Sequence, residues 1–321
     1  MLGSVPCNFC RVDDATEVFG AGVAQPSRIV RCNRCGLMYA SPRAKEPDHV
    51  QIQAWDPHHQ HFVDRDPRRY EKERLQTRDF ARTRKLINEL HPHRGKLLEI
   101  GSGLGFLLAE FKQDGWDVLG VEPDASYCQH AREVLGVPSI DTILETAGLA
   151  DETFDVIIMN HVIEHLGDPL ATLSEINRVL RPGGHLVLET PRYDTLMFRL
   201  LGRRERSINC SGHIYFFTTR TLRSLYEAAG FQTVQLAYVG RSLTMERLLW
   251  NVGIVSKSKR IQDGLTGLAR KFGLQKVHLR LNLRDMQRVC VQKVELPHGR
   301  RADAAASKTG AVTAESGASS R

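Results

Sequence analysis

The stretch LLEIGSGLGF at residues 97–106 decides the fold. An apolar run ends in three closely spaced glycines, and the apolar residues that follow have helical spacing. This order predicts a buried strand, a tight turn and a helix. Glycines permit the turn and let a ligand approach the backbone, because no Cβ intervenes. Ligands of parallel α/β sheets bind beyond the carboxyl ends of the strands, so the turn predicts a binding site.

Strand, turn and helix then alternate along the chain. Strands are expected at residues 96–100, 117–121, 154–160, 185–190, 231–239 and 286–294. Helices are expected at residues 104–112, 125–135 and 170–180, and after Thr218 as far as Ala229. The alternation predicts an α/β domain with a mostly parallel sheet.

Two acidic residues indicate which nucleotide binds. Glu122 lies 21 residues after Gly101, at the end of the second strand, where a carboxylate can accept hydrogen bonds from both ribose hydroxyls. Glu99 precedes the turn, and the glycine spacing is G-x-G-x-G rather than the dinucleotide pattern G-x-G-x-x-G. A carboxylate there suits a ligand with an ammonium group and no phosphate, which describes the methionine half of S-adenosylmethionine. An NAD-dependent oxidoreductase is the less favoured alternative.

Several motifs, in order, resemble those of class I S-adenosylmethionine-dependent methyltransferases. They are residues 98–106, 121–123, 154–157, 164–165 and 180–184, while 213–218 and 227–231 resemble a common subgroup. The resemblance covers residues 96–239, with 286–294 as a final antiparallel strand. It implies a Rossmann-like, mostly parallel seven-stranded sheet with helices on both faces. It also implies an enzyme that transfers a methyl group by in-line displacement.

The resemblance assigns residues around the cofactor. The glycine turn and its preceding acid would line the methionine part, Glu122 would hold the ribose, and Pro123 with residues 142–144 would flank the adenine. The end of the fourth strand would close the site. The full set is Glu99, Gly101, Ser102, Gly103, Glu122, Pro123, Thr142, Ile143, Asn160 and His161.

Three histidines are candidates for a general base, because a neutral imidazole accepts protons near pH 7. They are His161, His165 and His213. We favour His213, which lies on the loop after the fifth strand, and place His165 second; each could also be a structural histidine. Glu164-His165 further resembles a pair that can join a divalent-metal site in ubiquinone-biosynthesis O-methyltransferases. That family has another acid where this chain has His161.

Four cysteines near the start form two C-x2-C pairs: Cys7, Cys10, Cys32 and Cys35. Such pairs can supply four thiolates in a tetrahedron around a structural zinc ion, which leaves no open position for catalysis. Four free cysteines are the alternative. We therefore predict a zinc ribbon over residues 1–45. Such ribbons resemble those on some bacterial methyltransferases that act on sugars and surface polysaccharides.

The rest of the chain divides by composition. A helical linker is expected at 46–92, the methyltransferase domain at 93–298 and a disordered tail at 299–321. Residues 241–284 contain ten basic and two acidic residues, net +8, while the whole 321-residue chain carries +7. This insertion, with its apolar stretch near residue 250, suggests contact with a membrane or a lipid-linked substrate; a helix packed on the domain is the alternative.

The acceptor follows less directly from the sequence. We expect a small molecule or sugar as substrate and a cytoplasmic location, because no signal peptide or membrane span is evident. An RNA methyltransferase that grips phosphates with the ribbon and the insertion is the main alternative. Aromatic residues make up only 7% of the chain, which disfavours stacking on nucleic-acid bases.

Overall fold

The computed structural model describes residues 4–22, 27–42, 80–205, 208, 212–240, 242–244, 249, 258–274, 278–280 and 282–294. The predicted linker 46–92 lies outside the described residues up to position 79, and its last part is helix α3, Ala81–Leu90. The predicted tail 299–321 lies wholly outside them.

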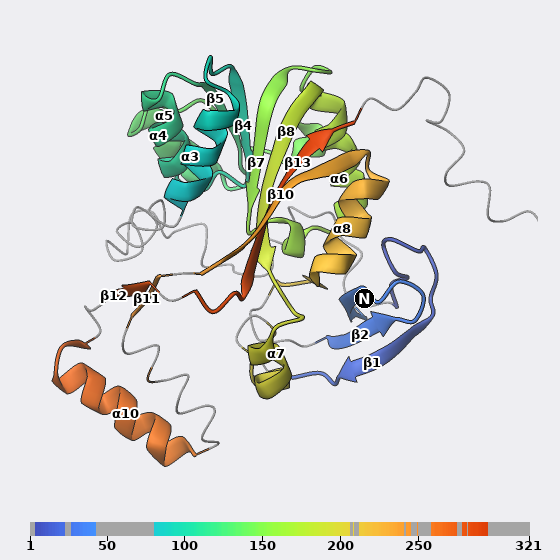
Figure 1. Ribbon diagram of the computed structural model, residues 1–321, viewed down its shortest axis with the longest axis vertical. Helices are drawn as coiled ribbons and strands as arrows, with labels where there is room; N and C mark the ends of the chain where they lie inside the picture. The colour runs from blue at the N-terminus through green and yellow to red at the C-terminus, as the bar shows by residue number, and fades with distance from the viewer. Residues whose placement is uncertain are drawn as a thin grey trace, which may run out of the picture.

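A seven-stranded sheet forms the centre of the molecule (Figure 1). Its order is β10-β13-β8-β7-β4-β5-β6, and β13 runs antiparallel to both neighbours while the other pairs are parallel. This confirms the predicted sheet. The strands are β4 Lys96–Ile100, β5 Asp117–Val121, β6 Ser139–Ile140, β7 Phe154–Asn160, β8 Leu180–Pro191, β10 Phe231–Val239 and β13 Met286–Lys293.

Helices cover both faces of this sheet, and each face has its own apolar core. On one face α3 packs with α4 (Phe106–Gln113) and α5 (Ala125–Glu133) against alternate strand residues such as Leu97 and Ile158. On the other face α6 (Pro169–Val179) and α8 (Thr219–Ala228) cover residues such as Leu98 and Ile157. The central strands are apolar on both faces because both faces are covered. Short 3-10 turns η3 (Leu144–Thr146) and η4 (Ile163–His165) follow β6 and β7.

Several boundaries differ from the sequence prediction, and two of them have a clear physical cause. Helix α4 begins at Phe106 rather than at 104, because Gly105 has φ +83° and ends the turn as the N-cap. Strand β8 begins at Leu180 rather than at 185. The sequence RPGG at residues 181–184 predicts a turn. In the structure Gly183 has φ +71° and the pairing register with β7 shifts, so the strand continues through a bulge.

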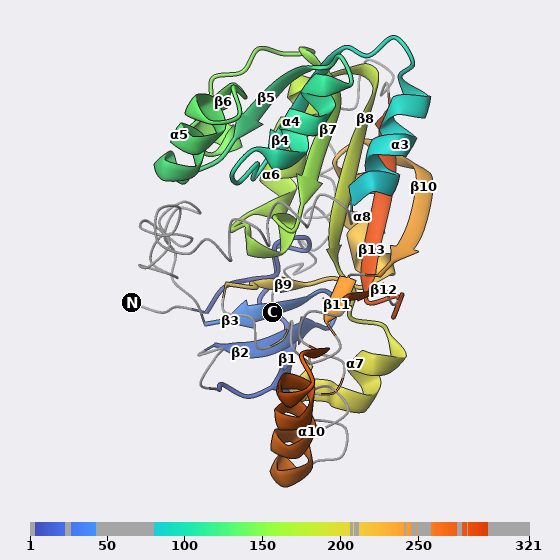
Figure 2. The same cartoon turned by 90° about the vertical axis from the view of Figure 1, so that its left-hand side faces the viewer.

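The cysteine-bearing segment forms a second sheet, which also includes a short strand from the large domain (Figure 2). Its order is β1-β2-β3-β9, with β1 Ala15–Phe19, β2 Arg28–Cys32, β3 Met38–Ser41 and β9 Tyr215–Phe216. Strand β9 pairs antiparallel with β3, where Tyr39 faces Tyr215. The sequence did not predict β9, because two residues are too few to show a period.

The basic insertion is described in part. It contains β11 (Ser242–Thr244), α10 (Lys259–Lys271) and β12 (His278–Arg280), and β11 pairs with β12.

A short helix, α7 (Leu196–Leu201), lies after β8 and is followed by the turn η5 (Gly202–Arg204). None of the helices in the described part of the chain has the length and apolar character needed to cross a bilayer.

A partly buried pair of histidines, His91 and His185, should make the free energy of unfolding depend on pH. His91 Nε2 lies 3.0 Å from His185 Nδ1, and burial, together with the charge of His91, lowers the pKa of His185 to about 4. The unfolded chain therefore binds this proton more readily between pH 6.5 and 4. We expect stability to fall over that window by up to about 3 kcal/mol from His185.

Urea unfolding at pH 7.5 and pH 4.5 checks this expectation. The variant His185→Gln should lose clearly less stability between the two pH values than the native chain does. Equal losses in both proteins would show that His185 does not cause the acid sensitivity.

Candidate active site

The glycine turn holds the backbone in a form that other residues resist. Gly101, Gly103 and Gly105 have φ of +69°, +52° and +83°. A Cβ on Gly101 would also lie 2.4 Å from Val162 Cγ2. The amide of Gly101 donates to the carbonyl of Val121 (2.8 Å), which ties the turn to the end of β5. Strand β4 and helix α4 thus present the turn at the carboxyl edge of the sheet.

Glu122 is fixed beside this turn by backbone amides. Its Oε2 accepts from the Gly103 amide at 3.0 Å, and its Oε1 accepts from the Asp124 amide at 3.1 Å. The carboxylate is buried, with a relative exposure of 9%. Each carboxylate oxygen can accept a further hydrogen bond, so the group is held in place with acceptor capacity left for a diol.

Polar atoms without partners lie buried behind the turn. Within the residues that the structure describes, Glu99 Oε2, Ser102 Oγ and both amide atoms of Asn160 have no hydrogen-bond partner. Burial and the nearby charge of Glu122 raise the pKa of Glu99 well above its usual range. Unpaired buried polar groups are costly, so a ligand that pairs with them would be favoured. An ammonium and carboxylate group, as in methionine, fits this donor and acceptor set.

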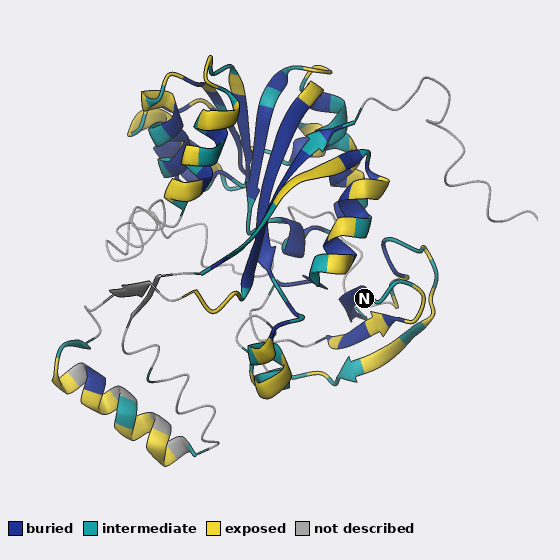
Figure 3. Cartoon of the chain, in the orientation of Figure 1, coloured by how far each residue is buried: buried dark blue, intermediate teal, exposed yellow. Residues whose placement is uncertain are grey.

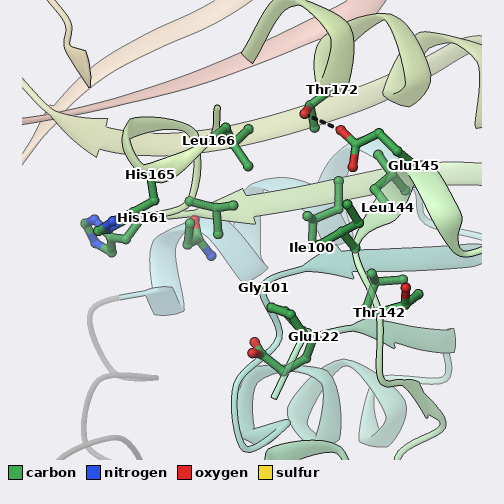
Figure 4. Close-up of a pocket in the computed structure, with 15 residues that line it drawn as sticks. Ile100, Gly101, Glu122, Thr142, Leu144, Glu145, His161, His165, Leu166 and Thr172 are labelled. Carbon is green, nitrogen blue, oxygen red and sulfur yellow. Dashed lines mark hydrogen bonds between the residues drawn. The ribbon is translucent and has the colours of Figure 1, made fainter. Parts of the chain in front are cut away.

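A cavity joins these elements at the carboxyl ends of β4, β5 and β7 (Figure 4). Glu122 and Thr142 lie on one side of it, while His161 and His165 lie at another end. Its lining residues are Ile100, Gly101, Val121, Glu122, Pro123, Thr142, Ile143, Leu144, Glu145, Asn160, His161, Val162, His165, Leu166 and Thr172. Apolar walls with a few convergent polar groups are typical of small-molecule sites.

Most residues assigned to the cofactor line this cavity, but three do not. Glu99, Ser102 and Gly103 are not among its lining residues, and the amide of Gly103 donates to Glu122. Thr172 and Glu145 line the cavity and hydrogen-bond to each other, which the sequence did not reveal. They come from α6 and η3, and no local motif marks a contact between elements 27 residues apart.

A buried carboxylate, Glu164, anchors a cluster of histidines next to the cavity. It follows β7 on η4 and is 1% exposed. Its Oε2 accepts from Thr190 Oγ1 at 2.9 Å. Burial opposes its ionisation, but a hydrogen bond from His161 and the charges of His165, His161 and His213 lower the pKa of Glu164 to about 2. The carboxylate is therefore ionised at neutral pH and can stabilise a protonated imidazole.

The two predicted base residues meet in this cluster. The rings of His165 and His213 are 4.8 Å apart in an edge-on arrangement. His165 Nδ1 donates to the Gly212 carbonyl at 2.9 Å, which leaves Nε2 as its basic atom. Burial lowers the pKa of His165, so the ring is neutral near pH 7. His213 is buried with Nδ1 3.3 Å from the Tyr193 hydroxyl, and it does not line the cavity itself.

The third histidine lies between two carboxylates. His161 Nδ1 is 3.6 Å from Glu164 Oε1, and its Nε2 is 3.8 Å from Glu189 Oε1. Glu189 also pairs with Arg288 across β8 and β13, at 3.2 Å in the buried interior. The backbone of His161 is left-handed, with φ +57°. His161 therefore links the end of β7 to Glu164 and to the Glu189–Arg288 pair.

Glu164, His165 and His213 could also hold a cation, since their ligand atoms lie within 4.8 Å of one another. One carboxylate and two imidazoles suit a transition metal, whereas Mg²⁺ prefers oxygen ligands. The oxygen ligand that an additional acid would give is absent, because position 161 is histidine. The donor set thus fits a transition metal better than magnesium.

A family model described as a methyltransferase domain matches residues 68–236, more than half of the chain. The chain belongs to this family. A ubiquinone biosynthesis O-methyltransferase of Bradyrhizobium is 38% identical over 117 residues, which cover 35% of this chain and 46% of that protein. An uncharacterized methyltransferase of Mycobacterium leprae is 35% identical over 96 residues, which cover 29% of this chain and 35% of that protein. The chain therefore spans less than half the length of these curated relatives.

Solved structures are similar at lower identity. A methyltransferase of Thermotoga maritima, described as a possible histamine N-methyltransferase, is 23% identical with a TM-score of 0.42 and covers 62% of this chain and 82% of its own. A putative methyltransferase of Haloferax volcanii, in complex with the Trm112 activator, is 14% identical with a TM-score of 0.47 and covers 64% and 84%.

The four cysteines near the start of the chain converge as two matching loops. The amide of Arg11 donates to the Cys7 carbonyl (2.7 Å), and the amide of Gly36 donates to the Cys32 carbonyl (2.9 Å). Arg11 and Gly36 both have positive φ, +57° and +80°. Glycine adopts this left-handed conformation easily, and Arg11 adopts it as well in the first loop.

The sulfur atoms have the spacing of a tetrahedral site. The ligand atoms of the four cysteines lie within 4.8 Å of one another, and Cys7 Sγ is 3.6 Å from Cys35 Sγ. Zinc–sulfur bonds of about 2.3 Å place tetrahedral sulfurs about 3.8 Å apart. Burial raises the pKa of Cys10 to about 11, so a bound cation would be needed to keep this thiolate ionised at neutral pH.

The cysteine-bearing segment with strands β1, β2 and β3, called the ribbon below, is joined directly to the segment that carries His213. The Ala40 amide of β3 donates to the Ile214 carbonyl at 2.8 Å, and the Ile214 amide donates to the Glu164 carbonyl at 2.7 Å. At its other end, Arg11 pairs with Asp168, the N-cap of α6, at 3.0 Å. The cysteine-bearing segment thus contacts the chain on both sides of the histidine cluster.

Proposed function

We propose that the chain uses S-adenosylmethionine to methylate a small molecule or sugar whose attacking group loses a proton to His213. One observation carries the proposal: a single cavity has a fixed diol acceptor, Glu122, on one side and the Glu164 histidine cluster at another end. The family membership supports methyl transfer, and the cluster supports an acceptor that must be deprotonated.

Different residues of the chain would bind different parts of the cofactor. When bound, S-adenosylmethionine supplies a methyl group on a sulfonium that leaves as a neutral thioether once the acceptor attacks. Glu122 would bind the ribose hydroxyls, and Asn160, which lines the cavity with both amide atoms unpaired, would pair with the amino-acid end. Their common role is orientation, which brings acceptor and methyl group into line. The walls formed by Ile143 and Leu144 would hold the adenine away from water.

The proton of the acceptor would pass to His213 once the acceptor reaches past the cavity-lining ring of His165, which lies against the His213 ring. As the acceptor bonds to the methyl carbon, the acceptor's bond to hydrogen breaks and the imidazole becomes positively charged. Glu164, ionised at neutral pH, stabilises that charge without taking the proton itself. His165, neutral and oriented by the Gly212 carbonyl, lies against the same ring and also faces the cavity.

The ribbon would act as a structural zinc site that positions His213. Zinc would cross-link the two cysteine loops, and β3 would then hold residues 214–216 by backbone hydrogen bonds. A closed four-thiolate site has no open position, so the zinc itself takes no chemical part.

Replacing Cys32 with serine should show whether zinc binding by the cysteines positions His213 for turnover without affecting cofactor binding. We expect zinc content to fall from about one ion per chain and turnover to fall by roughly tenfold or more, because β3 no longer holds the His213 segment. Affinity for S-adenosylhomocysteine should change little, since the cavity belongs to the large sheet. Metal analysis, calorimetry and a methylation assay measure the three quantities.

The buried cysteine Cys290 supplies the matched control, because it lies on β13 away from the ribbon. Cys290→Ala should keep zinc and turnover. If the chain holds no zinc, or if Cys32→Ser keeps full turnover after losing it, the positioning role is wrong.

A direct test of the function uses labelled cofactor. The purified chain is incubated with a small-molecule extract and S-adenosylmethionine carrying an isotopic methyl group, and mass spectrometry searches for products with one labelled methyl. The proposal predicts such a product and its loss in His213→Ala. Label that appears only in RNA or protein would contradict the proposed acceptor class.

A further inference from the structure

Two helices carry exposed apolar side chains at one end of the molecule. Helix α7 follows β8, and α10 belongs to the basic insertion. Both lie toward the bottom of Figures 1 and 2, the end to which β7 and β8 run, and Figure 3 shows exposed residues along both. Neither feature is used by the proposed methyl transfer.

Packing fixes which side of α7 faces outward. The Phe198 ring contacts Phe19 of β1 and Tyr193, with centroids 6.1 and 5.6 Å away. Leu196 and Leu200 lie one helical turn apart on a different side, and they are 70% and 65% exposed. The ribbon therefore holds α7 so that two leucines meet solvent.

Helix α10 presents an apolar stripe of its own. Residues 261, 265, 268 and 272 are apolar and spaced to fall on one side of a helix. Ile261 is 48%, Leu268 50% and Phe272 66% exposed. Exposed aliphatic side chains in register on one stripe are uncommon in a surface that faces only water.

Positive charge surrounds both sets of apolar residues. Residues 196–204 contain three arginines and no acid, and residues 258–274 contain four basic residues and one acid, Asp263. Arg199 and Arg204 are exposed beside α7, as are Arg260 and Lys271 on α10. Helices α7 and α10, which together are called the α7–α10 surface below, thus each combine exposed apolar side chains with net positive charge.

We propose that the α7–α10 surface docks onto a bilayer that contains anionic lipids. The leucines and Phe272 would enter the boundary between headgroups and acyl chains, while the flanking basic residues would meet acidic headgroups. A second copy of the chain fits less well, because the same positive flanks would face each other. RNA would leave the aliphatic stripes without a partner. The cavity lies at the carboxyl ends of the strands, so docking brings it toward the lipid surface.

Vesicle co-sedimentation of the full chain tests the proposal. Vesicles of phosphatidylcholine alone are compared with vesicles that also contain phosphatidylglycerol, at low salt. The native chain should sediment with the anionic vesicles and be released by salt. The double variants Leu196→Ser/Leu200→Ser and Leu268→Ser/Phe272→Ser should each need roughly tenfold more lipid for half-binding.

Val134→Ser is the matched control, because Val134 is an exposed apolar residue at the end of α5, on the opposite end of the molecule. It should bind vesicles as the native chain does. Calorimetry with S-adenosylhomocysteine shows separately whether each variant keeps its cavity, so a failed docking test leaves the methyl-transfer proposal standing.

Three results would overturn the docking proposal. The first is no sedimentation of the native chain with anionic vesicles. The second is unchanged lipid binding by both leucine variants. The third is binding to single-stranded RNA that exceeds binding to vesicles and does not depend on the leucines. A dimer that is lost in these variants, without vesicle binding, would assign the surface to a second copy and equally reject the lipid.

Discussion

The variant Glu122→Ala is expected to bind S-adenosylhomocysteine about 100-fold more weakly than the native chain. The carboxylate would lose two ribose hydrogen bonds, and hydrogen bonds to charged groups contribute about 1.5–3 kcal/mol each. The amides of Gly103 and Asp124 would also lose their acceptor, which loosens the glycine turn. Isothermal titration calorimetry measures the change.

Two further variants sharpen this prediction. Glu122→Gln keeps one acceptor oxygen, so its affinity should lie between those of the native chain and Glu122→Ala. Glu133→Ala removes an exposed acid from the end of α5 and should bind normally. If folded Glu122→Ala binds within a few-fold of the native chain, Glu122 does not hold the ribose.

The variant His213→Ala is expected to lower turnover by about 100-fold or more while affinity for S-adenosylhomocysteine is kept. The ring would no longer accept the proton of the acceptor, but His213 does not line the cavity, so cofactor contacts remain. Steady-state methylation rates and calorimetry measure the two effects. Added imidazole should restore part of the turnover, which a purely structural role would not allow.

His185→Ala provides the matched histidine control at pH 8, because His185 pairs with His91 at the opposite end of the sheet. It should retain turnover. Unchanged turnover in His213→Ala, or equal losses in both variants, would end the assignment of His213 as the base.

The sequence predicts the large sheet well because its signals are local. Strands β4, β5 and β7 match the expected residues, since each is an apolar run bounded by glycine or polar residues. The acid at the end of β5 and the glycine turn are likewise read from spacing. Helix ends are less exact, as Gly105 shows, because the backbone conformation at a cap is set by the turn as a whole.

Contacts between segments that are distant in the chain could not be predicted from local sequence patterns. The meeting of His213 with Glu164 depends on β9 and on a backbone bond between residues 50 apart. The union of β3 with β9 joins parts of the chain that sequence composition assigns to different domains. Glu99, Ser102 and Gly103 are assigned to the cofactor from a local motif, but they are not among the residues that line the cavity.

Calorimetric titration of the purified, folded chain with S-adenosylhomocysteine tests the central claim most directly. We predict one site per chain with a dissociation constant of roughly micromolar size, and weaker binding in Glu122→Ala. A cooperatively folded chain that gives no heat of binding up to about 1 mM of this ligand would contradict the whole assignment of the cavity.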